Sequence, residues 1–276
     1  VVPVFALRTK KSCGIGEIED LKPLVDWAKQ VGMSVIQTLP INDTLEHMNW
    51  QDSYPYNSIS SIALHPLYLS ISPLGHIKDK QKAKDFSEEI KSLNRRASVD
   101  YEDVLEFKMR YFRALYNQNK DDTFAQPEYY KFVKSNKEWL YPYAVFCALR
   151  DKNKTADFRK WKKYSVFSQA DVDKLSSGKS EIKDDVFFYV YLQYHLHNQM
   201  TEAIDYAHAN GIALKGDLPI GISRNSVDAW QHPQYFNFGQ QAGAPPDYYS
   251  AEGQNWGFPT YNWEEMARDN YKWWKK

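Results

Sequence analysis

Residues 21–40 have the sequence LKPLVDWAKQVGMSVIQTLP, in which a helical pattern runs directly into a strand pattern. Apolar residues recur at helical spacing on one side, which predicts a helix from about Asp20 to Val31. Gly32 stands at the position where a glycine commonly ends a helix. The next residues, Met33 to Leu39, predict a strand that Pro40 ends.

A first strand is predicted before this helix, at Val1–Leu7, and a third one much later, at Ile212–Ile220. The third strand follows a long predicted helix from about Asp184 to Asn210. Two strands joined through a helix form a parallel pair with a right-handed crossover. Apolar and polar residues alternate in the third strand, which predicts one apolar face and one charged face that ends at Asp217. This order of elements is typical of an α/β barrel or of a doubly wound sheet, and both place their sites at the carboxyl ends of the strands.

The middle of the chain is predicted to be helical, because apolar stripes recur there at helical spacing. The run WLYPYAVFCALR at residues 139–150 indicates a core helix, and a Ser/Gly-rich stretch at 176–180 follows the helical region. We therefore expect three parts. Residues 1–76 hold the first two strands and a substrate loop, 77–183 form a helical insertion, and 184–276 continue the α/β fold with a long helix, the third strand, an aromatic loop and a final helix.

Composition excludes several functional classes. The 35 basic residues equal the 35 acidic ones, so we expect neither nucleic acid nor a membrane as partner. Cys13 and Cys147 lie far apart, which fits a reducing compartment, and we expect a cytoplasmic protein. His195 and His197 lie two apart on a helix and face different directions, so no metal is expected. The content of 9 Trp, 20 Tyr and 14 Phe suits either a packed core or the stacking of sugar rings.

Both ends of the chain look cut. Residue 1 is not Met, and the first strand has no lead-in. Asn262 and Glu265 have the spacing of a capping box and open a predicted final helix, which continues to residue 276 without a stop signal. A deliberate truncation, a proteolytic cut or natural processing would each produce such ends.

Polar and aromatic segments follow the predicted strands in order. A glycine pair, Gly14 and Gly16, follows the first strand, but Glu19 stands where a dinucleotide fingerprint needs its third glycine, so no nucleotide cofactor is expected. The segment DSYPYNS at 52–58 follows the second strand, and Asp217 lies near the end of the third. An aromatic loop follows, with GAPPDYY at 243–249 and GQNWGFP at 253–259. Each segment alone is an ordinary turn, whereas their shared position after strand ends indicates one site.

Together these segments resemble the 4-α-glucanotransferases of glycoside hydrolase family 77. The resemblance rests on GIGE at 14–17, LPINDT at 39–44, DSYPY at 52–56, GDLPIG at 216–221 and the run from Gly243 to Trp263. It covers essentially the whole chain. An extra tyrosine, Tyr54, and the segment ALHPLYL at 63–69 are similar to the plant-type disproportionating enzymes rather than to the short bacterial amylomaltases.

The resemblance implies a fold, a reaction and a set of substrate contacts. The fold would be the first three β/α units of a (β/α)8 barrel with a helical insertion, and the reaction a retaining transfer of α-1,4-glucan segments from maltose or maltodextrins. No cofactor is implied. Tyr56 is similar to the tyrosine beside the donor sugar, with Asp52 and Ser53 supporting it, and Asp217 to a carboxylate near that sugar. The remaining implied substrate contacts, on a mobile loop that closes over glucan, are Asp247, Tyr248, Gln254 and Trp256.

One departure from the family pattern limits this expectation. The family's nucleophile lies in an Arg-Ile-Asp-His type motif on a fourth strand, its acid/base Glu follows later, and neither motif is found here. We therefore expect no catalytic residue in this chain and no activity from the chain alone. A non-catalytic glucan-binding piece and a purely structural piece remain alternatives, which titration with maltoheptaose would separate. Unpaired edges of the first and third strands would favour self-association, which light scattering would detect.

Overall fold

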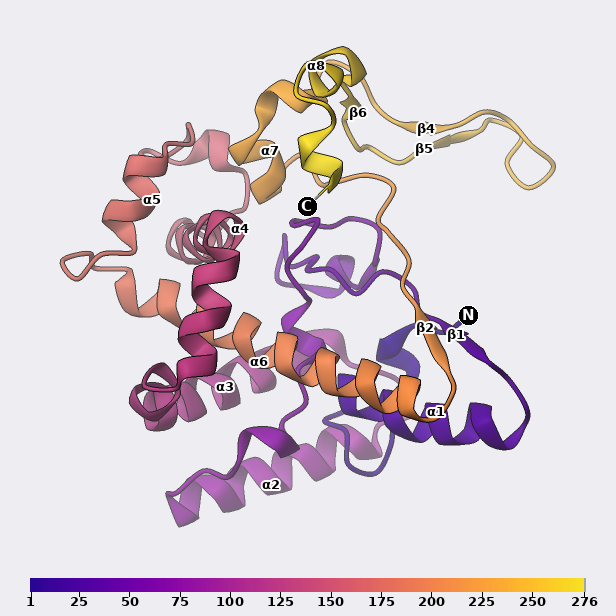
Figure 1. The fold of residues 1–276 in the computed structure, drawn as a ribbon, viewed down its shortest axis with the longest axis vertical. Coiled ribbons are helices and arrows are strands. Elements are labelled where there is room, and N and C mark those ends of the chain that lie inside the picture. The colour runs from indigo at the N-terminus through magenta and orange to yellow at the C-terminus, as the bar shows by residue number, and fades with distance from the viewer. Residues whose placement is uncertain (276) are drawn as a thin grey trace.

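A computed structural model describes residues 1–275 of the chain (Figure 1). The helices are α1 Leu21–Gln30, α2 Lys80–Arg95, α3 Tyr101–Phe124, α4 Pro127–Asn153, α5 Gln169–Leu175, α6 Lys183–Ala209, α7 Val227–Gln231 and α8 Trp263–Arg268. The strands are β1 Val35–Gln37, β2 Ala213–Lys215, β3 Phe236–Asn237, β4 Gly243–Ala244, β5 Gln254–Asn255 and β6 Thr260–Tyr261. None of the described helices is long and apolar enough to cross a membrane.

A small parallel sheet joins segments from the beginning and from the last third of the chain. β1 pairs in parallel with β2, with Val35 opposite Ala213, and Val2 adds a parallel bridge to Thr38 on the other side of β1. Helices α1 and α6 cover one face of this sheet, where Ile36 is buried in a cluster with apolar residues of both helices. The opposite face is open, since Val35 is 55% exposed. The strands pair in parallel, as predicted from the sequence.

The prediction of a strand at Val1–Leu7 is wrong beyond its second residue, because Val4–Ala6 form a 3-10 turn. The chain bends there to pack on the glycine loop that follows. The Gly16 amide donates to the Phe5 carbonyl at 2.9 Å, and a Cβ on Gly16 would lie 1.9 Å from the Val4 carbonyl oxygen. A glycine is thus required at position 16 by the close approach of two backbone segments.

Three other predicted elements are too long. The strand predicted at Met33–Leu39 is limited to β1, Val35–Gln37. The strand predicted at Ile212–Ile220 is limited to β2, and its expected apolar face ends early, since Leu218 is 71% exposed and Ile220 is 57% exposed. The final helix ends at Arg268, after which Asn270 and Tyr271 adopt positive φ and a 3-10 turn covers Lys272–Lys275. Lys276, which the predicted helix included, lies outside the described residues.

The helical region packs around α4 and α6, whose rings fill most of the core. Tyr143 of α4 and Tyr189 of α6 are almost fully buried and meet edge to face, with centroids 6.4 Å apart. Phe146 packs against Trp161 and Trp230 in the same core. A large part of the aromatic content therefore serves packing rather than ligand stacking.

Helix α6 also holds the long loop that follows β1. The Gln193 side chain accepts from the Leu64 amide at 2.9 Å and donates to the Leu64 carbonyl at 2.7 Å. Gln199 does the same to Ser70, at 2.8 and 2.9 Å. Each glutamine thus bonds both the amide and the carbonyl of one loop residue, as a neighbouring strand would. These bonds fix the conformation of a loop that has no regular secondary structure.

Candidate functional site

The loops that follow β1 and β2 meet at one hydrogen bond. The Tyr56 hydroxyl donates to Asp217 Oδ2 at 2.8 Å. Both side chains are partly exposed, so each remains accessible to solvent beyond the carboxyl ends of the strands. The hydrogen bond to Asp217 raises the pKa of Tyr56, which therefore stays a neutral donor at physiological pH. The topology predicted this meeting, because the carboxyl ends of adjacent parallel strands lie at the same edge of a sheet.

Asp52 is buried and points into its own loop. Its carboxylate accepts from the His47 amide at 3.0 Å and from the Met48 amide at 2.6 Å, and only 1% of the residue is exposed. Burial raises the pKa of this carboxyl, while the hydrogen bonds from His47 and Met48 oppose that rise. Asp52 therefore shapes the turn before Tyr56, whereas the next residue, Ser53, is exposed.

Sequence analysis missed Glu46, which ties the two site loops together. Its carboxylate accepts from the Asn57 side chain at 3.0 Å, from the Ser223 hydroxyl at 2.5 Å and from the Asn225 side chain at 2.7 Å. Asn57 adjoins Tyr56, and Ser223 lies a few residues beyond Asp217. Since these partners come from distant parts of the chain, no local spacing around Glu46 indicates its role.

The aromatic loop forms a two-stranded arm that extends away from the rest of the molecule (Figure 1). Its strands β4 and β5 pair antiparallel, and β3 and β6 pair at its base. At its tip, Asp247 accepts from the amides of Tyr249 and Ser250, at 2.9 and 2.7 Å, while Tyr248 is 97% exposed. These local hydrogen bonds preform the tip and leave its tyrosine ring available to a ligand.

The other two residues predicted on the arm also bond locally. Gln254 accepts from the Trp256 indole nitrogen at 2.8 Å, which fixes the ring over the arm. Among the described residues, no hydrogen bond joins Asp247, Tyr248, Gln254 or Trp256 to Tyr56 or Asp217. The structure thus joins the two strand-end loops and leaves the arm as a separate element.

Arg224 anchors the base of this arm and was also missed by sequence analysis. Its guanidinium donates to the carbonyls of Gly257 at 2.8 Å, Phe238 at 2.6 Å and Gln240. Phe238 and Gln240 follow β3, and Gly257 precedes β6, so the three acceptors lie on both sides of the arm near its base. The planar fork of an arginine suits such multiple contacts, which a lysine would not reproduce.

We expect Arg224→Ala to loosen the arm and to raise the rate of proteolytic cleavage within residues 245–253 by about tenfold, because the lost charge-assisted hydrogen bonds are worth about 1.5 kcal/mol or more. Limited proteolysis with mass spectrometry of the fragments measures this rate. Arg110→Ala is the control, since Arg110 of α3 pairs with Glu89 of α2, away from the arm. Equal cleavage of the arm in both variants would contradict the anchoring role.

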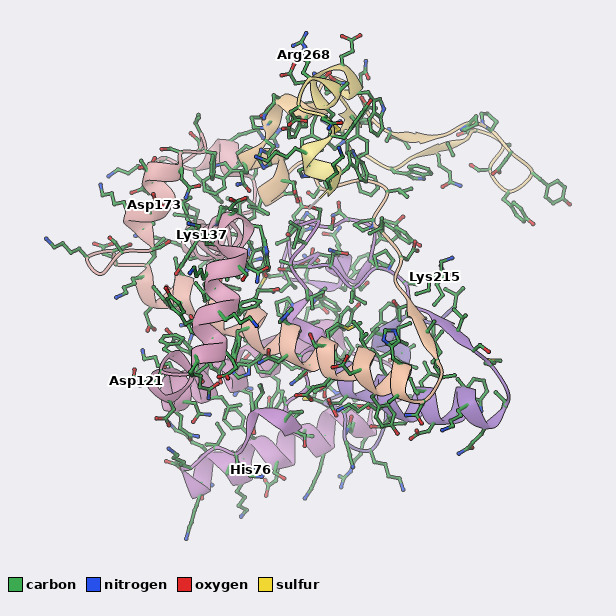
Figure 2. The ribbon with its side chains drawn as sticks, in the orientation of Figure 1. His76, Asp121, Lys137, Asp173, Lys215 and Arg268 are labelled. Atoms are coloured by element: carbon green, nitrogen blue, oxygen red, sulfur yellow. The ribbon has the colours of Figure 1, made fainter. Side chains whose placement is uncertain are left out.

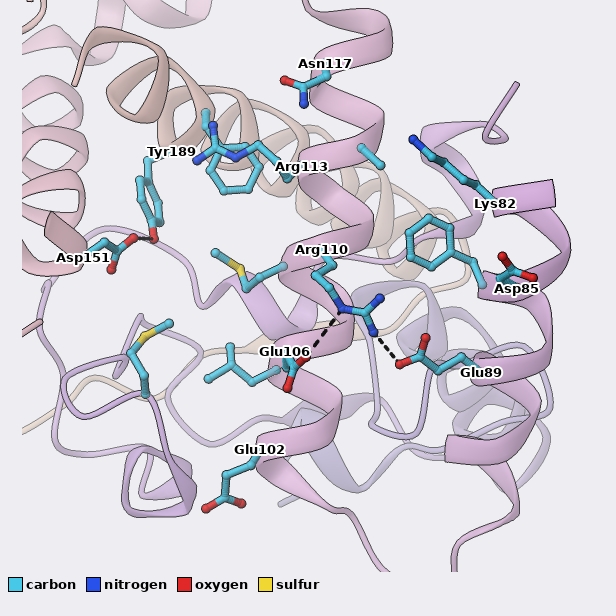
Figure 3. A pocket seen from close by; sticks show the side chains of 16 residues that line it. Lys82, Asp85, Glu89, Glu102, Glu106, Arg110, Arg113, Asn117, Asp151 and Tyr189 are labelled. Carbon is cyan, nitrogen blue, oxygen red and sulfur yellow. Dashed lines mark hydrogen bonds and ion pairs between the residues drawn. The ribbon is translucent and has the colours of Figure 1, made fainter. Parts of the chain in front are cut away.

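Cavities elsewhere on the chain do not coincide with this site. One of about 960 Å³ is lined mainly by α2 and α3, with residues of α4 and α6 (Figure 3), and there Arg110 forms ion pairs with Glu89 at 2.6 Å and Glu106 at 3.7 Å. None of the predicted site residues lines it. Another, of about 530 Å³, includes Asp52 and Ser53 in its wall but neither Tyr56 nor Asp217. Within residues 1–275, no group of three or more His, Cys, Asp or Glu side chains could hold a metal ion.

Comparison with known proteins gives consistent matches. The family model of glycoside hydrolase family 77, described as 4-alpha-glucanotransferase, matches residues 2–276. A rice (Oryza sativa subsp. japonica) protein named 4-alpha-glucanotransferase DPE2 is 47% identical over 99% of this chain, which covers 29% of that protein. A 4-alpha-glucanotransferase of Chlamydia pneumoniae is 40% identical over 100% of this chain, which covers 51% of it. The chain thus spans about half, or less, of the length of these relatives.

Solved structures share the fold at low sequence identity. Amylomaltase from Streptococcus agalactiae, solved in complex with acarbose, superposes with a TM-score of 0.81 at 21% identity, over 99% of this chain and 55% of that one. Amylomaltase from Corynebacterium glutamicum gives a TM-score of 0.78 at 20% identity, over 98% of this chain and 37% of that one. At these identities the likeness supports the α/β fold alone.

Proposed function

Because this chain belongs to glycoside hydrolase family 77, the 4-α-glucanotransferases, we propose that the protein transfers α-1,4-glucan segments between maltodextrins, or from maltose to an acceptor glycan. The resemblance inferred from the motifs is confirmed by the family match and by the identity to the plant enzyme. The observation that carries the proposal is the hydrogen bond between Tyr56 and Asp217, which brings a carboxylate and a tyrosine together at the strand ends.

In this proposal Tyr56 and Asp217 hold the donor sugar. A carboxylate that already accepts one hydrogen bond still has free lone pairs for sugar hydroxyls, and a tyrosine offers both a ring face and a polar tip. Asp52 and Ser53 support Tyr56 from the preceding turn. The arm residues Asp247, Tyr248, Gln254 and Trp256 would close over the bound glucan once substrate is present.

We assign the chemistry to a retaining mechanism whose two carboxylates lie outside this chain. Such a pair must stand about 5 Å apart across the scissile bond. Of the carboxylates described near the site, Asp52 and Asp247 accept backbone amides of their own loops and Glu46 accepts three side chains, which leaves Asp217 as the one presented to substrate. A single presented carboxylate cannot be both nucleophile and acid/base. The three strand positions would then be the first of an eight-stranded barrel, with 77–183 as its helical insertion.

The test is an assay of the intact protein with maltotriose. Transfer predicts both glucose and maltodextrins longer than maltotriose, and the 276-residue chain by itself should release no glucose above background. Glucose and maltose without any longer product would contradict transfer. Turnover by the isolated chain would contradict only the placement of the carboxylates, so the two parts of the proposal are tested separately.

A further inference from the structure

A basic pocket lies on the helical insertion, apart from the site described above. It has a volume of about 500 Å³ and is formed by the end of α4, the loop at 162–164, the end of α5 and the segment at 177–182. The Ser/Gly-rich stretch that follows the helical region in the sequence forms one wall. We call this the lysine pocket, after the five lysines that line it: Lys152, Lys162, Lys163, Lys174 and Lys179.

Positive charge in the lysine pocket is largely uncompensated. Its one lining carboxylate, Glu181, pairs with Lys152 at 3.1 Å and is 88% exposed. In the described part of the chain, the other four lysines form no ion pair within 4.0 Å. Acids on the adjoining elements include Asp151 of α4, which pairs with Arg150 at 2.9 Å, and Asp171 and Asp173 of α5, of which Asp173 accepts from the Gln169 side chain at 2.9 Å. Several ammonium groups around one hollow create a positive potential that favours an anion.

Buried side chains and a loop bonded to the core define the shape of the lysine pocket. Leu149, Leu175 and Ile182 are buried and give it an apolar floor. Tyr164 lines one side, and its carbonyl accepts from the Trp230 indole at 2.9 Å, which fixes that loop to the core. The Ser180 hydroxyl oxygen accepts from the Ile182 amide, so its proton remains available to a ligand. Charged groups at the rim and an apolar floor suit a ligand with an anionic head and a small organic body.

We propose that the lysine pocket binds the phosphate monoester dianion of a small organic phosphate. The ammonium groups face the phosphate oxygens, Ser180 donates a hydrogen bond, and the apolar floor takes the organic part. A volume of about 500 Å³ is within the usual range for small-molecule sites. No residue of the lysine pocket belongs to the proposed donor site, so this binding is independent of glucan transfer.

Calorimetric titration of the intact protein with ribose 5-phosphate, inorganic phosphate and ribose tests the proposal. Both phosphates should bind saturably, ribose should not, and affinity should fall as salt is raised. Tighter binding of ribose 5-phosphate would show that the organic part is recognised. Equal affinities, or tighter binding of inorganic phosphate, would overturn the proposal of an organic phosphate whose body lies on the apolar floor. Absence of saturable binding by either phosphate, or equal binding of ribose, would overturn it.

A matched pair of charge reversals tests the location. The double variant Lys162→Glu/Lys174→Glu should weaken phosphate binding by about tenfold or more, since two attractive charges become repulsive. Lys134→Glu/Lys137→Glu makes the same change of charge on an exposed stretch of α4, where Lys137 is labelled in Figure 2, and should stay within about twofold of the unmodified protein. Equal weakening in both variants would overturn the assignment to this pocket. Unchanged thermal unfolding of both variants confirms that folding is not the cause.

Discussion

Replacing Asp217 with asparagine in the intact protein should lower kcat/KM for maltotriose by about 10- to 100-fold. The carboxylate accepts the Tyr56 hydroxyl and, in the proposed function, the hydroxyls of the donor sugar. Hydrogen bonds to a charged acceptor are worth about 1.5–3 kcal/mol, and each 1.4 kcal/mol is a factor of ten in rate. An asparagine keeps the size of the side chain but loses the charge and one acceptor oxygen. Initial rates of glucose release measure the effect.

The chain offers a matched control for this substitution. Asp26 of α1 accepts the Tyr206 hydroxyl at 2.6 Å, which is the same type of contact on an exposed part of the helical layer. Asp26→Asn should therefore change kcat/KM by less than about twofold, because surface substitutions away from the site have small effects. Equal losses in the two variants would show that Asp217 acts on folding in general and not on the substrate.

The substitution Lys108→Met should lower the free energy of unfolding by about 3–5 kcal/mol, because it leaves a buried carboxylate without its partner. Lys108 is fully buried, and its ammonium contacts Glu17 at 2.5 Å and the Leu67 carbonyl at 2.7 Å. The pair joins α3 to the glycine loop after the first strand segment. Urea unfolding followed by fluorescence measures the loss. The double variant Glu17→Gln/Lys108→Met should recover much of it, since a neutral amide is cheaper to bury than a lone charge.

Two controls apply to Lys108→Met: the pH dependence of its loss of stability, and a variant that breaks an exposed ion pair. Burial raises the pKa of Glu17 to about 7, above its ordinary value of 4.5, although Lys108 opposes the rise. The folded state thus holds this proton more tightly than the unfolded state, and the loss of Lys108 raises the pKa of Glu17 further, so the deficit of Lys108→Met should be largest at alkaline pH, shrink as pH falls to about 7 and stay constant below that. Lys120→Met breaks the exposed pair with Asp184 and should cost less than about 1 kcal/mol. A Lys108→Met deficit no larger than that of Lys120→Met would contradict the buried-pair account.

Two of the helices of this fold could be predicted closely, whereas the final helix and the strands could not. Helix α1 and helix α6 begin and end within one residue of the predicted bounds, because amphipathic spacing and the glycines after them are local signals. Strand length depends on the neighbouring strand, which the local sequence does not specify. Ile212–Ile220 therefore has the composition of a long strand, yet only Ala213–Lys215 pair with β1.

Contacts in the candidate site could be predicted only where they follow from the order and direction of the strands. Tyr56 and Asp217 follow adjacent parallel strands, so their meeting follows from the order of elements. Glu46 and Arg224 have their roles through hydrogen bonds to residues of other loops, which no spacing within their own segments reveals. Asp52 was expected to support Tyr56, and its burial and its bonds to the His47 and Met48 amides emerge only from the folded loop.

A double-mutant cycle between Tyr56→Phe and Asp217→Asn in the intact protein, measured as kcat/KM for maltotriose, tests most directly whether these two residues act together on the donor sugar. If they do, each single variant loses activity, and the double variant loses less than the sum, with a coupling energy of about 1–2 kcal/mol. Additive losses within about 0.3 kcal/mol, or single variants as active as the unmodified protein, would contradict the account.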